Sequence, residues 1–597
     1  MMDEAANLKN KIYLLFIFIG LKKLFILSIF IILGSLFEVI GIGLIGPFIS
    51  MLLDNNIVNE NIYLNKIFLN SPEYIKNNFI TFFGFFLIFI FFIVNSFLAS
   101  LFYLIEKVAR ESTADLSISL LKNYFKNDYI FFVKNNSSNL VKNIVIETQQ
   151  VVHGIVLPIL QAIGRIFIIV SIFFLLASIN LNLTIFIILF FLSLFFIIFL
   201  FVKNKLRKIG IERSFYDKLK FIISNETINS IKEAKILKLE NFFLKKFIIT
   251  SYKYAKIHVK VVVYTIFPKY LIEFIVLSLI VLILLLFNQN STFLNNLPTL
   301  SVFIFAGYRI LPGAQLIYSS LSAIKKSEES LNIIYRDLFL NIKNLNENDN
   351  AAENEIIFNK SLEFKNVGFS YDDRTKSFIN ELNFKINKFD KVALVGKTGS
   401  GKSTLIDLIT GLLKPTKGQI FIDNKECEIK SNSSWQEKIN YLPQKMFFLD
   451  SNLKENIAIG TDQNNINDKK IIDACNFAEL DVNKSSISIT SDIGESGKRL
   501  SGGEKQRVGI ARLFYNMREI LIFDESTNAI DINTEEKIFN KIFNLKKTVL
   551  FATHNLRNIK KFKKIIFFSN SEIVIGTFDE LLNSNNEFKI LINNYKD

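Results

Sequence analysis

The chain has 597 residues, half of them hydrophobic, with 62 Phe and a formal net charge of +15. A chain of this length is expected to form at least two domains, each with its own hydrophobic core. The excess of apolar residues argues against an entirely soluble enzyme. Because the basic residues flank apolar runs, they favour the cytoplasmic loops of a membrane protein over a nucleic-acid-binding surface.

Six apolar stretches fill the first half of the chain, each near the ~20 residues that a helix needs to cross a bilayer. A shorter apolar run at 12–20, followed by Lys22 and Lys23, predicts an interfacial helix. Short helices are predicted at 127–139 and 226–237, and the loop at 55–70 fits either an amphipathic surface helix or an ordinary packed loop. The six predicted spans lie at about 24–52, 79–104, 150–178, 183–202, 261–287 and 297–322.

Loop charge predicts the orientation of these spans. The loops between spans two and three and between spans four and five are rich in Lys and Arg, whereas the loops after spans three and five have neither. Positively charged loops remain on the cytoplasmic side. Both termini are therefore expected in the cytoplasm.

A phosphate-binding motif follows a linker rich in Asn and Glu at 345–355. Residues 396–404 read GKTGSGKST, between an expected strand and an expected helix, which fits G-x-x-x-x-G-K-[ST]. Backbone N–H groups surround the phosphates in such a loop, Lys402 reaches the β- and γ-phosphates, and Ser403 ligates Mg²⁺. The expected nucleotide contacts here are Gly396, Lys397, Thr398, Gly399, Ser400, Gly401, Lys402, Ser403 and Thr404.

Two further motifs extend this prediction. The run EILIFDES at 519–526 is an apolar strand ending in two carboxylates, of which Asp524 is placed to hold Mg²⁺ and Glu525 to polarise the attacking water. In RLSGGEKQR, at 499–507, Ser501 and two glycines begin a helix and form a second anion-binding end. One nucleotide does not need two such ends, which indicates that the second serves a partner's nucleotide.

The run LSGGEKQR closely resembles the signature of ABC transporter ATPases, and six spans followed by one ATPase domain resemble an exporter half-transporter. The resemblance implies an α-helical six-span transmembrane domain (1–325), a linker (326–356) and an α/β P-loop NTPase domain of ABC type (357–597). It also implies an ATPase coupled to transmembrane transport, working as a homodimer by alternating access with ATP and Mg²⁺ in a bacterial inner (plasma) membrane.

The resemblance assigns roles to further residues. Tyr371 in FSYDD corresponds to the aromatic that stacks on adenine, and His554 in FATHN to the switch histidine at the γ-phosphate. Gln444 in YLPQKMFF corresponds to the residue that links the nucleotide site to the membrane loops, and is assigned to both catalysis and Mg²⁺ binding. Asp531 in NAID resembles the loop that communicates across the dimer in this family. The signature contacts to the partner's nucleotide fall on Leu500, Ser501, Gly502, Gly503 and Glu504.

Three cations inside the predicted spans bear on the substrate. Arg309, Lys269 and Arg165 lie in spans six, five and three, where a charge costs about 2.5–3.5 kcal/mol on insertion scales. Such cations face a wet cavity, where they bind an anionic substrate group or pair with a carboxylate, for instance Lys269 or Arg309 with Glu38 or Glu273. Both alternatives remain open at this stage.

Short patterns in two spans resemble a narrower group. Y-R-x-x-P in span six and P-[KR]-x-x-x-E in span five are similar to those of bacterial flippases of lipid-linked oligosaccharides. A lipid or lipid-linked glycan is therefore the expected substrate. A hydrophobic drug or peptide exporter is the main alternative, and an ATP-gated channel or sensor is a third. Membrane lipids are expected partners, and nucleic acid is not.

Overall fold

The computed structural model describes residues 8–53, 62–287, 293–340, 355–371, 379–430, 432–482, 488–569 and 573–596. Its contacts divide the chain into two units. The first comprises Met1–Asn127 and Phe132–Asn348, and the second comprises Asp128–Phe131 and Asp349–Asp597.

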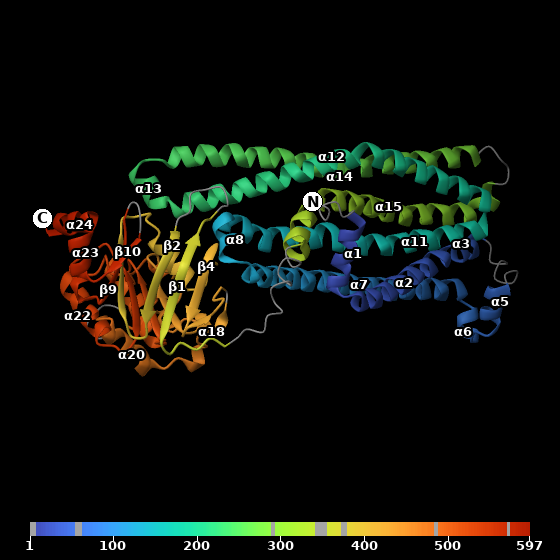
Figure 1. The fold of residues 1–597 in the computed structure, drawn as a ribbon. Helices are drawn as coiled ribbons and strands as arrows, with labels where there is room; N and C mark the ends of the chain where they lie inside the picture. Colours follow the sequence, from blue (N-terminus) through green and yellow to red (C-terminus); the bar gives the residue numbers. More distant parts are fainter. Residues whose placement is uncertain are drawn as a thin grey trace. The chain divides into compact units, whose positions relative to one another are not determined.

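The first unit is helical in its described residues (Figure 1). Its long helices follow from apolar runs that Gly and Pro rarely interrupt. The elements are α1 (Leu8–Ile19), α2 (Leu21–Gly43), α3 (Ile45–Leu53), α5 (Ile62–Leu69), α6 (Glu73–Lys76), α7 (Phe79–Lys126), α8 (Tyr129–Lys134), α9 (Ser137–Lys142), η1 (Asn143–Glu147), α10 (Thr148–Val151), η2 (Val152–Val156), α11 (Leu157–Ile179), α12 (Leu181–Asn229), α13 (Ile231–Ile236), α14 (Glu240–Phe287), α15 (Phe293–Tyr335) and η3 (Arg336–Leu340).

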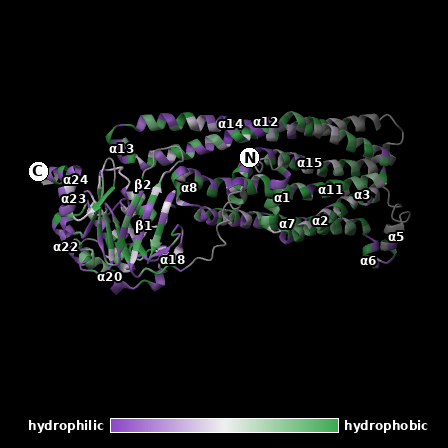
Figure 2. Ribbon diagram, in the orientation of Figure 1, coloured by the Kyte–Doolittle hydropathy of each residue, from purple (hydrophilic) through white to green (hydrophobic). Residues whose placement is uncertain are grey.

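Each of the six predicted spans lies in the helical part of this unit. Among the described residues, three helical segments have the length and hydropathy to cross a membrane: Leu21–Leu52, Phe79–Lys126 and Ser137–Ile179. The helices extend beyond the apolar stretches, and Figure 2 shows many hydrophilic residues where α12 and α14 approach α13.

The predicted short helices are confirmed as α8 and α13, and residues 12–19 of the run at 12–20 belong to α1. Of the loop at 55–70, residues from Ile62 onward form α5, and residues 54–61 lie outside the described part of the chain. The sequence assigns residues 326–340 to a linker, but the structure shows them as helix. Residues 326–335 form the end of α15, and Arg336–Leu340 form η3.

The second unit contains two sheets. A four-stranded antiparallel sheet has the order β2-β1-β4-β5, and a six-stranded sheet has the order β10-β9-β3-β8-β7-β6, parallel except for β10. The strands are β1 (Ser361–Phe369), β2 (Ile379–Asn387), β3 (Lys391–Gly396), β4 (Lys417–Ile422), β5 (Lys425–Glu426), β6 (Ile439–Leu442), β7 (Ile520–Asp524), β8 (Thr548–Ala552), β9 (Lys564–Phe568) and β10 (Ile573–Gly576).

The helices of this unit connect and cover the strands (Figure 1). They are α17 (Lys402–Ile409), α18 (Ser433–Gln436), α19 (Leu453–Ile457), η4 (Gln463–Asn465), α20 (Asp468–Phe477), η5 (Glu495–Gly497), α21 (Gly502–Tyr515), α22 (Ile532–Phe543), η6 (Ile559–Lys561), α23 (Phe578–Ser584) and α24 (Asn586–Lys596).

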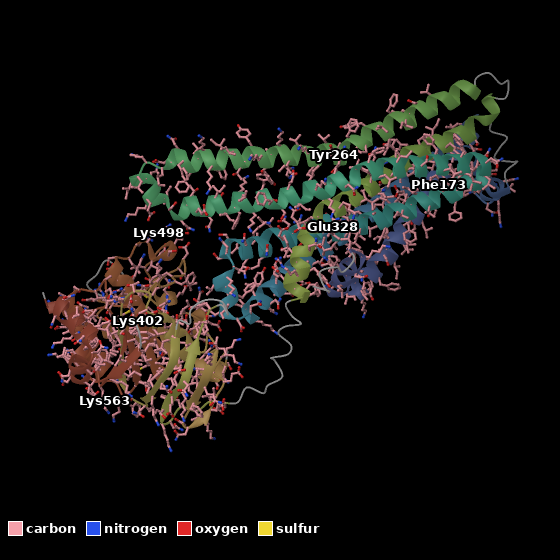
Figure 3. All side chains as sticks on the ribbon, turned by 45° about the horizontal axis from the view of Figure 1, so that its top comes forward. Phe173, Tyr264, Glu328, Lys402, Lys498 and Lys563 are labelled. Atoms are coloured by element: carbon pink, nitrogen blue, oxygen red, sulfur yellow. The ribbon has the colours of Figure 1, made fainter. Side chains whose placement is uncertain are left out.

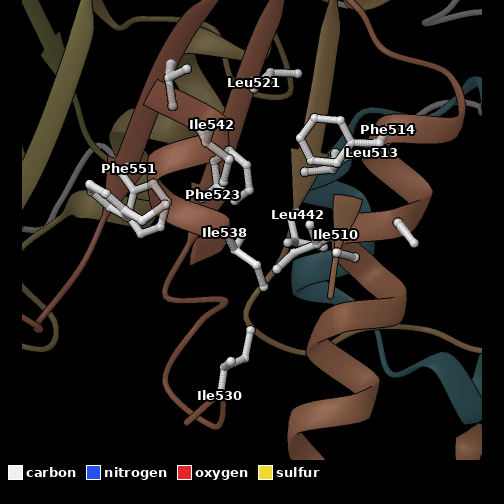
Figure 4. Close-up of a cluster of buried hydrophobic side chains, with 14 of the residues drawn as sticks. Leu442, Ile510, Leu513, Phe514, Leu521, Phe523, Ile530, Ile538, Ile542 and Phe551 are labelled. Atoms are coloured by element: carbon white, nitrogen blue, oxygen red, sulfur yellow. The ribbon is translucent and has the colours of Figure 1, made fainter. Parts of the chain in front are cut away.

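The parallel strands are buried on both faces, because successive side chains alternate between two apolar clusters. In β7, Leu521 and Phe523 join one cluster and Ile520 and Ile522 join the other. Figure 4 shows part of the first cluster, where Phe523 and Phe551 lie near side chains of α21 and α22. This double burial fixes the carboxyl ends of β3, β7 and β8, where the candidate site lies.

Candidate nucleotide site

The loop between β3 and α17 has the backbone that the phosphate motif requires. Gly399 and Gly401 have φ of +80° and +107°, in the left-handed region that favours glycine. A Cβ on Gly396 would lie 2.7 Å from Cβ of Phe568, so β9 also approaches the loop closely. Gly401 is the N-cap of α17, and the N–H groups at this helix end form an anion site.

Lys402 is the first residue of α17, directly after this loop, in the second unit (Figure 3). Its side chain is 4% exposed, and Nζ donates to the carbonyl oxygens of Gly396 (2.8 Å) and Lys397 (3.1 Å). Burial lowers the pKa of Lys402, and the nearby Glu525 carboxylate opposes that shift. Nζ lies 3.5 Å from Glu525 Oε1, so the phosphate-binding cation and the predicted base lie in one site.

Asp524 ends β7 and accepts two hydroxyl hydrogen bonds on Oδ2. Ser403 Oγ and Tyr441 Oη each lie 3.3 Å from that oxygen. Burial raises the pKa of Asp524, and these hydrogen bonds oppose the shift. The geometry brings together Ser403 and Asp524, two of the predicted Mg²⁺ ligands.

Glu525 is the centre of a second set of contacts. Gln444 Nε2 donates to Glu525 Oε2 at 2.9 Å, and His554 Nε2 lies 2.6 Å from Glu525 Oε1. The same His554 nitrogen is 3.3 Å from Lys402 Nζ and 3.4 Å from Thr398 Oγ1. Four residues predicted from separate motifs therefore converge on one point.

Strand order explains this convergence. β7 pairs with β8 on one side and β6 on the other, with Asp524 opposite Ala552 and Leu442 opposite Phe523. Residues just beyond these ends therefore meet at one edge of the sheet. Tyr441 was missed by the sequence reasoning. Its place in β6, three residues before Gln444, is the signal that identifies it.

Tyr371 lies beside the phosphate loop's helix. Its hydroxyl is 3.3 Å from Thr404 Oγ1, and its ring meets Phe369 edge-on with centroids 4.9 Å apart. These contacts place an aromatic ring next to the predicted nucleotide site. Residues 372–378, which follow it, lie outside the described part of the chain.

The signature residues begin α21 with a capping box. Ser501 Oγ accepts from the N–H of Glu504, and the Glu504 carboxylate accepts from the Ser501 N–H at 2.8 Å and its hydroxyl at 2.7 Å. A Cβ on Gly503 would lie 2.9 Å from the Ala529 carbonyl oxygen, which explains the glycine. The hydrogen bonds of Ser501 and Glu504 stay within the signature, and within the described single chain they do not join it to the phosphate loop. Leu500, just before Ser501, is buried, and Gly502 is the first residue of α21.

Asp531 caps α22, accepting from the N–H of Thr534 at 3.0 Å. Its carboxylate therefore holds the start of that helix, which is the next helix after β7 and Glu525 in the chain.

The three predicted membrane cations have separate surroundings. Arg165 Nη1 lies 3.8 Å from Glu38 Oε2, so Glu38, which the sequence suggested as a partner of Lys269 or Arg309, lies beside Arg165. Lys269 is exposed, with Nζ 5.9 Å from the Tyr270 ring centroid. The Arg309 side chain lies outside the described residues, although its backbone belongs to α15.

Comparisons with known families match both parts of the chain. The ABC transporter transmembrane region family matches residues 24–305, and the ABC transporter family matches residues 379–528. A solved structure of a bacterial Atm1-family ABC exporter with ATP bound superposes with a TM-score of 0.76, covering 96% of this chain and 99% of that one. At 18% identity, that likeness shows the fold alone.

Two curated proteins match this chain at higher sequence identity than that structure does, but only over part of their length. The lactococcin-G-processing and transport ATP-binding protein LagD of Lactococcus lactis subsp. lactis is 34% identical over 252 residues, which is 42% of this chain and 35% of LagD. The beta-(1→2)glucan export ATP-binding/permease protein NdvA of Agrobacterium vitis is 33% identical over 236 residues, which is 39% of this chain and 40% of NdvA. These matches span well under half of either relative.

Proposed function

We propose that this chain, an ABC exporter half-transporter in which an ABC transmembrane region precedes an ABC ATPase domain, uses ATP hydrolysis to move an amphipathic substrate across a membrane. The observation that carries the proposal is the convergence of Lys402, Gln444, Glu525 and His554 beside the phosphate loop. If the acidic residues followed this strand by chance, the Glu525 side chain would not be expected to contact Lys402, Gln444 and His554 together.

Each residue has a distinct part in the proposed hydrolysis. Lys402 exchanges its carbonyl partners for phosphate oxygens, and the N–H groups of α17 bind the same phosphates. Glu525 accepts the proton of the attacking water. Gln444 and His554, both within hydrogen-bonding distance of Glu525, orient its carboxylate.

The residues present fit Mg²⁺. Ser403 Oγ and Asp524 Oδ2 supply neighbouring oxygen ligands, and Gln444 offers an amide oxygen nearby; oxygen is the ligand that Mg²⁺ prefers. When bound, Mg²⁺ neutralises charge on the β- and γ-phosphates. Asp524 is held for this role by Tyr441, which restrains its carboxylate from the neighbouring strand.

We further propose a homodimer in the bacterial inner membrane, with both termini cytoplasmic. The start of α21 at Ser501 and Gly502 is a second anion-binding helix end, and a partner's ATP is its natural ligand. Cysteines introduced at Ser501 and Thr398 should cross-link between protomers in the presence of ATP. Cross-linking confined to single chains, or an active monomer, would contradict the dimer.

The first substrate candidate is a lipid or lipid-linked oligosaccharide. Its support is the motif resemblance around Lys269 and Arg309 and the partial similarity to NdvA, which is named for glucan export. If Arg309 binds a lipid phosphate, Arg309→Ala should abolish flipping in proteoliposomes while basal ATPase activity and the melting curve remain near wild type. Normal flipping by a stable Arg309→Ala protein would remove this candidate.

The second candidate is export of a hydrophobic drug or peptide. A specific observation favours it: the first, helical unit contains a mainly apolar cavity with an acidic wall residue, Glu38. ATPase activity in lipid, measured against lipid-linked glycans and lipophilic drugs, separates the candidates by which class stimulates turnover several-fold.

A further inference from the structure

The buried face of α22 carries a carboxylate among apolar side chains. Its buried residues recur at the spacing of a single helix face and are Glu535, Ile538, Phe539 and Ile542. Figure 4 shows Ile538 and Ile542 among the buried side chains of the first apolar cluster. Glu535 is only 7% exposed, and a carboxylate so buried needs hydrogen-bond donors around it. Its partners therefore indicate what it does.

Glu535 accepts hydrogen bonds from two segments that are distant in sequence. The Thr527 hydroxyl donates to Oε1 at 2.8 Å, and the Asn555 amide donates through Nδ2 to Oε2 at 3.0 Å. Thr527 follows the end of β7, and Asn555 follows the end of the paired strand β8. A carboxylate only accepts hydrogen bonds, so it suits two donors. Glu535 thus joins the segments that follow two neighbouring strands.

The segment after β8 is ordered further by Asn555. The Asn555 N–H donates to Thr553 Oγ1 at 2.8 Å, and Oδ1 accepts from the Arg557 N–H at 3.1 Å. Because Oδ1 accepts from Arg557, the amide presents its NH2 group to Glu535. His554 lies between Thr553 and Asn555, so hydrogen bonds restrain the chain on both sides of it.

The segment after β7 contains a strained backbone. Glu525 has a φ of +49°, in the left-handed region that residues other than glycine uncommonly adopt. Its N–H donates to the Ala552 carbonyl oxygen at 3.0 Å, and the Ile530 N–H donates to the Thr527 carbonyl oxygen at 3.1 Å. Such a conformation persists where the surrounding structure holds it in place. The hydrogen bond from Thr527 to Glu535 is a side-chain restraint directly beyond this strained residue.

We propose that Glu535 is a positioning residue for ATP hydrolysis, which joins the segment of Glu525 to the segment of His554 and so holds these two side chains in contact. His554 Nε2 lies 2.6 Å from Glu525 Oε1. The inference rests on the proposed function, in which Glu525 accepts the proton of the attacking water, and it names the residue that aligns this base. Loss of the alignment should slow hydrolysis more than it weakens ATP binding, because Lys402 and the phosphate loop belong to other segments.

ATPase kinetics of the full-length protein in lipid nanodiscs test the proposal. Glu535→Ala should lower kcat by about 10–100-fold, because a displacement of about 1 Å near a reacting group can cost two orders of magnitude. KM for ATP and the affinity for a fluorescent ATP analogue should change little. Turnover is expressed per bound nucleotide, so a loss of folded protein does not lower it. Glu536→Ala, which removes an exposed carboxylate from the same helix, is the matched control and should leave kcat unchanged.

A double variant separates positioning from a general structural role. Because Glu535 acts through the contact between Glu525 and His554, the variant Glu535→Ala/His554→Ala should turn over about as fast as the slower single variant. Independent structural damage would instead multiply the two losses. If Glu535→Ala fails to fold, Thr527→Val takes its place, since it removes one of the donors to Glu535 at nearly constant volume. Thr527→Val should also lower kcat, and Thr527→Ser, which restores the hydroxyl, should recover most of that loss.

Three results would overturn the proposal: wild-type kcat in a folded Glu535→Ala protein, losses that multiply in the double variant, or a parallel fall in kcat and ATP affinity. Glu525→Gln is measured alongside these variants. If Glu525→Gln keeps wild-type turnover, the proposed base is wrong and the inference fails with it. If Glu525→Gln loses turnover while Glu535→Ala keeps it, the inference alone is wrong.

Discussion

The nucleotide site and the Glu38 cavity specify their ligands in different ways. At the nucleotide site, Glu525 alone has three polar partners between 2.6 and 3.5 Å, all fixed near the ends of packed strands or within the phosphate loop. In the cavity, Glu38 lies 3.8 Å from the Arg165 guanidinium, and the other described wall side chains are mainly apolar. The first site is defined by directional contacts, which favour one chemistry. The second is defined by shape and apolar contact, which admit many kinds of molecule.

The largest effect is expected from Glu525→Gln. The amide keeps the size of the carboxylate but cannot accept the proton of water, so hydrolysis should slow by roughly 10²–10⁴. ATP binding should persist, because Lys402 and the phosphate loop are unchanged. ATPase turnover and ATP binding, measured on the same nanodisc sample, check this. Near-normal turnover would show that Glu525 is not the base.

Lys402→Ala should affect binding instead of chemistry. Losing a buried charge-assisted contact of about 1.5–3 kcal/mol weakens ATP binding by about 10–100-fold. Lys563→Ala is a matched control, because Lys563 is an exposed lysine of the same unit (Figure 3). Equal ATP affinities in the two variants would show that Lys402 does not contact the phosphates.

In the membrane unit, the Glu38–Arg165 pair should matter to stability more than to ATPase activity. Removing either charge removes the ion pair from the other, which should cost about 1–3 kcal/mol in this partly exposed pair. The double variant Glu38→Gln/Arg165→Gln should recover most of that loss. Melting curves of the solubilised protein test the cycle. Strictly additive losses would show that the two side chains are not coupled.

The smallest effect is expected from Asp407→Asn, on protein stability. Asp407 lies on α17, where burial and the nearby Asp524 carboxylate raise the pKa of Asp407 to about 6. Since the unfolded pKa is about 3.9, the folded state binds the proton more readily. The charged form therefore destabilises the fold above pH 6, and stability is regained as the pH falls from about 6 towards 4. Asp407→Asn should raise the free energy of unfolding by about 1–2 kcal/mol at pH 8 and by less at pH 5.

Fluorescence of Trp435, the single tryptophan and fully buried in the same unit, can report this unfolding. Asp473→Asn changes an exposed carboxylate on α20 and is the control. A stabilisation by Asp407→Asn that is equal at both pH values would contradict the raised pKa.

The sequence by itself determined the order of a helical membrane part and an α/β ATPase part, and the family matches confirm that order. It could do so because apolar runs and the GKTGSGKST loop are local patterns, set by helix length and by glycine conformation. It also predicted Lys402, Gln444, Glu525 and His554 from separate motifs, although their roles remain proposals.

Only the tertiary structure decided which of these residues meet. Strand order brings Tyr441 to Asp524 and His554 to Glu525, and no local pattern encodes that pairing. The same holds in the membrane unit, where Arg165 was predicted to face either a substrate or a carboxylate, and helix packing placed it beside Glu38. A charge in an apolar run shows only that a partner is required, because the partner comes from another helix distant in sequence.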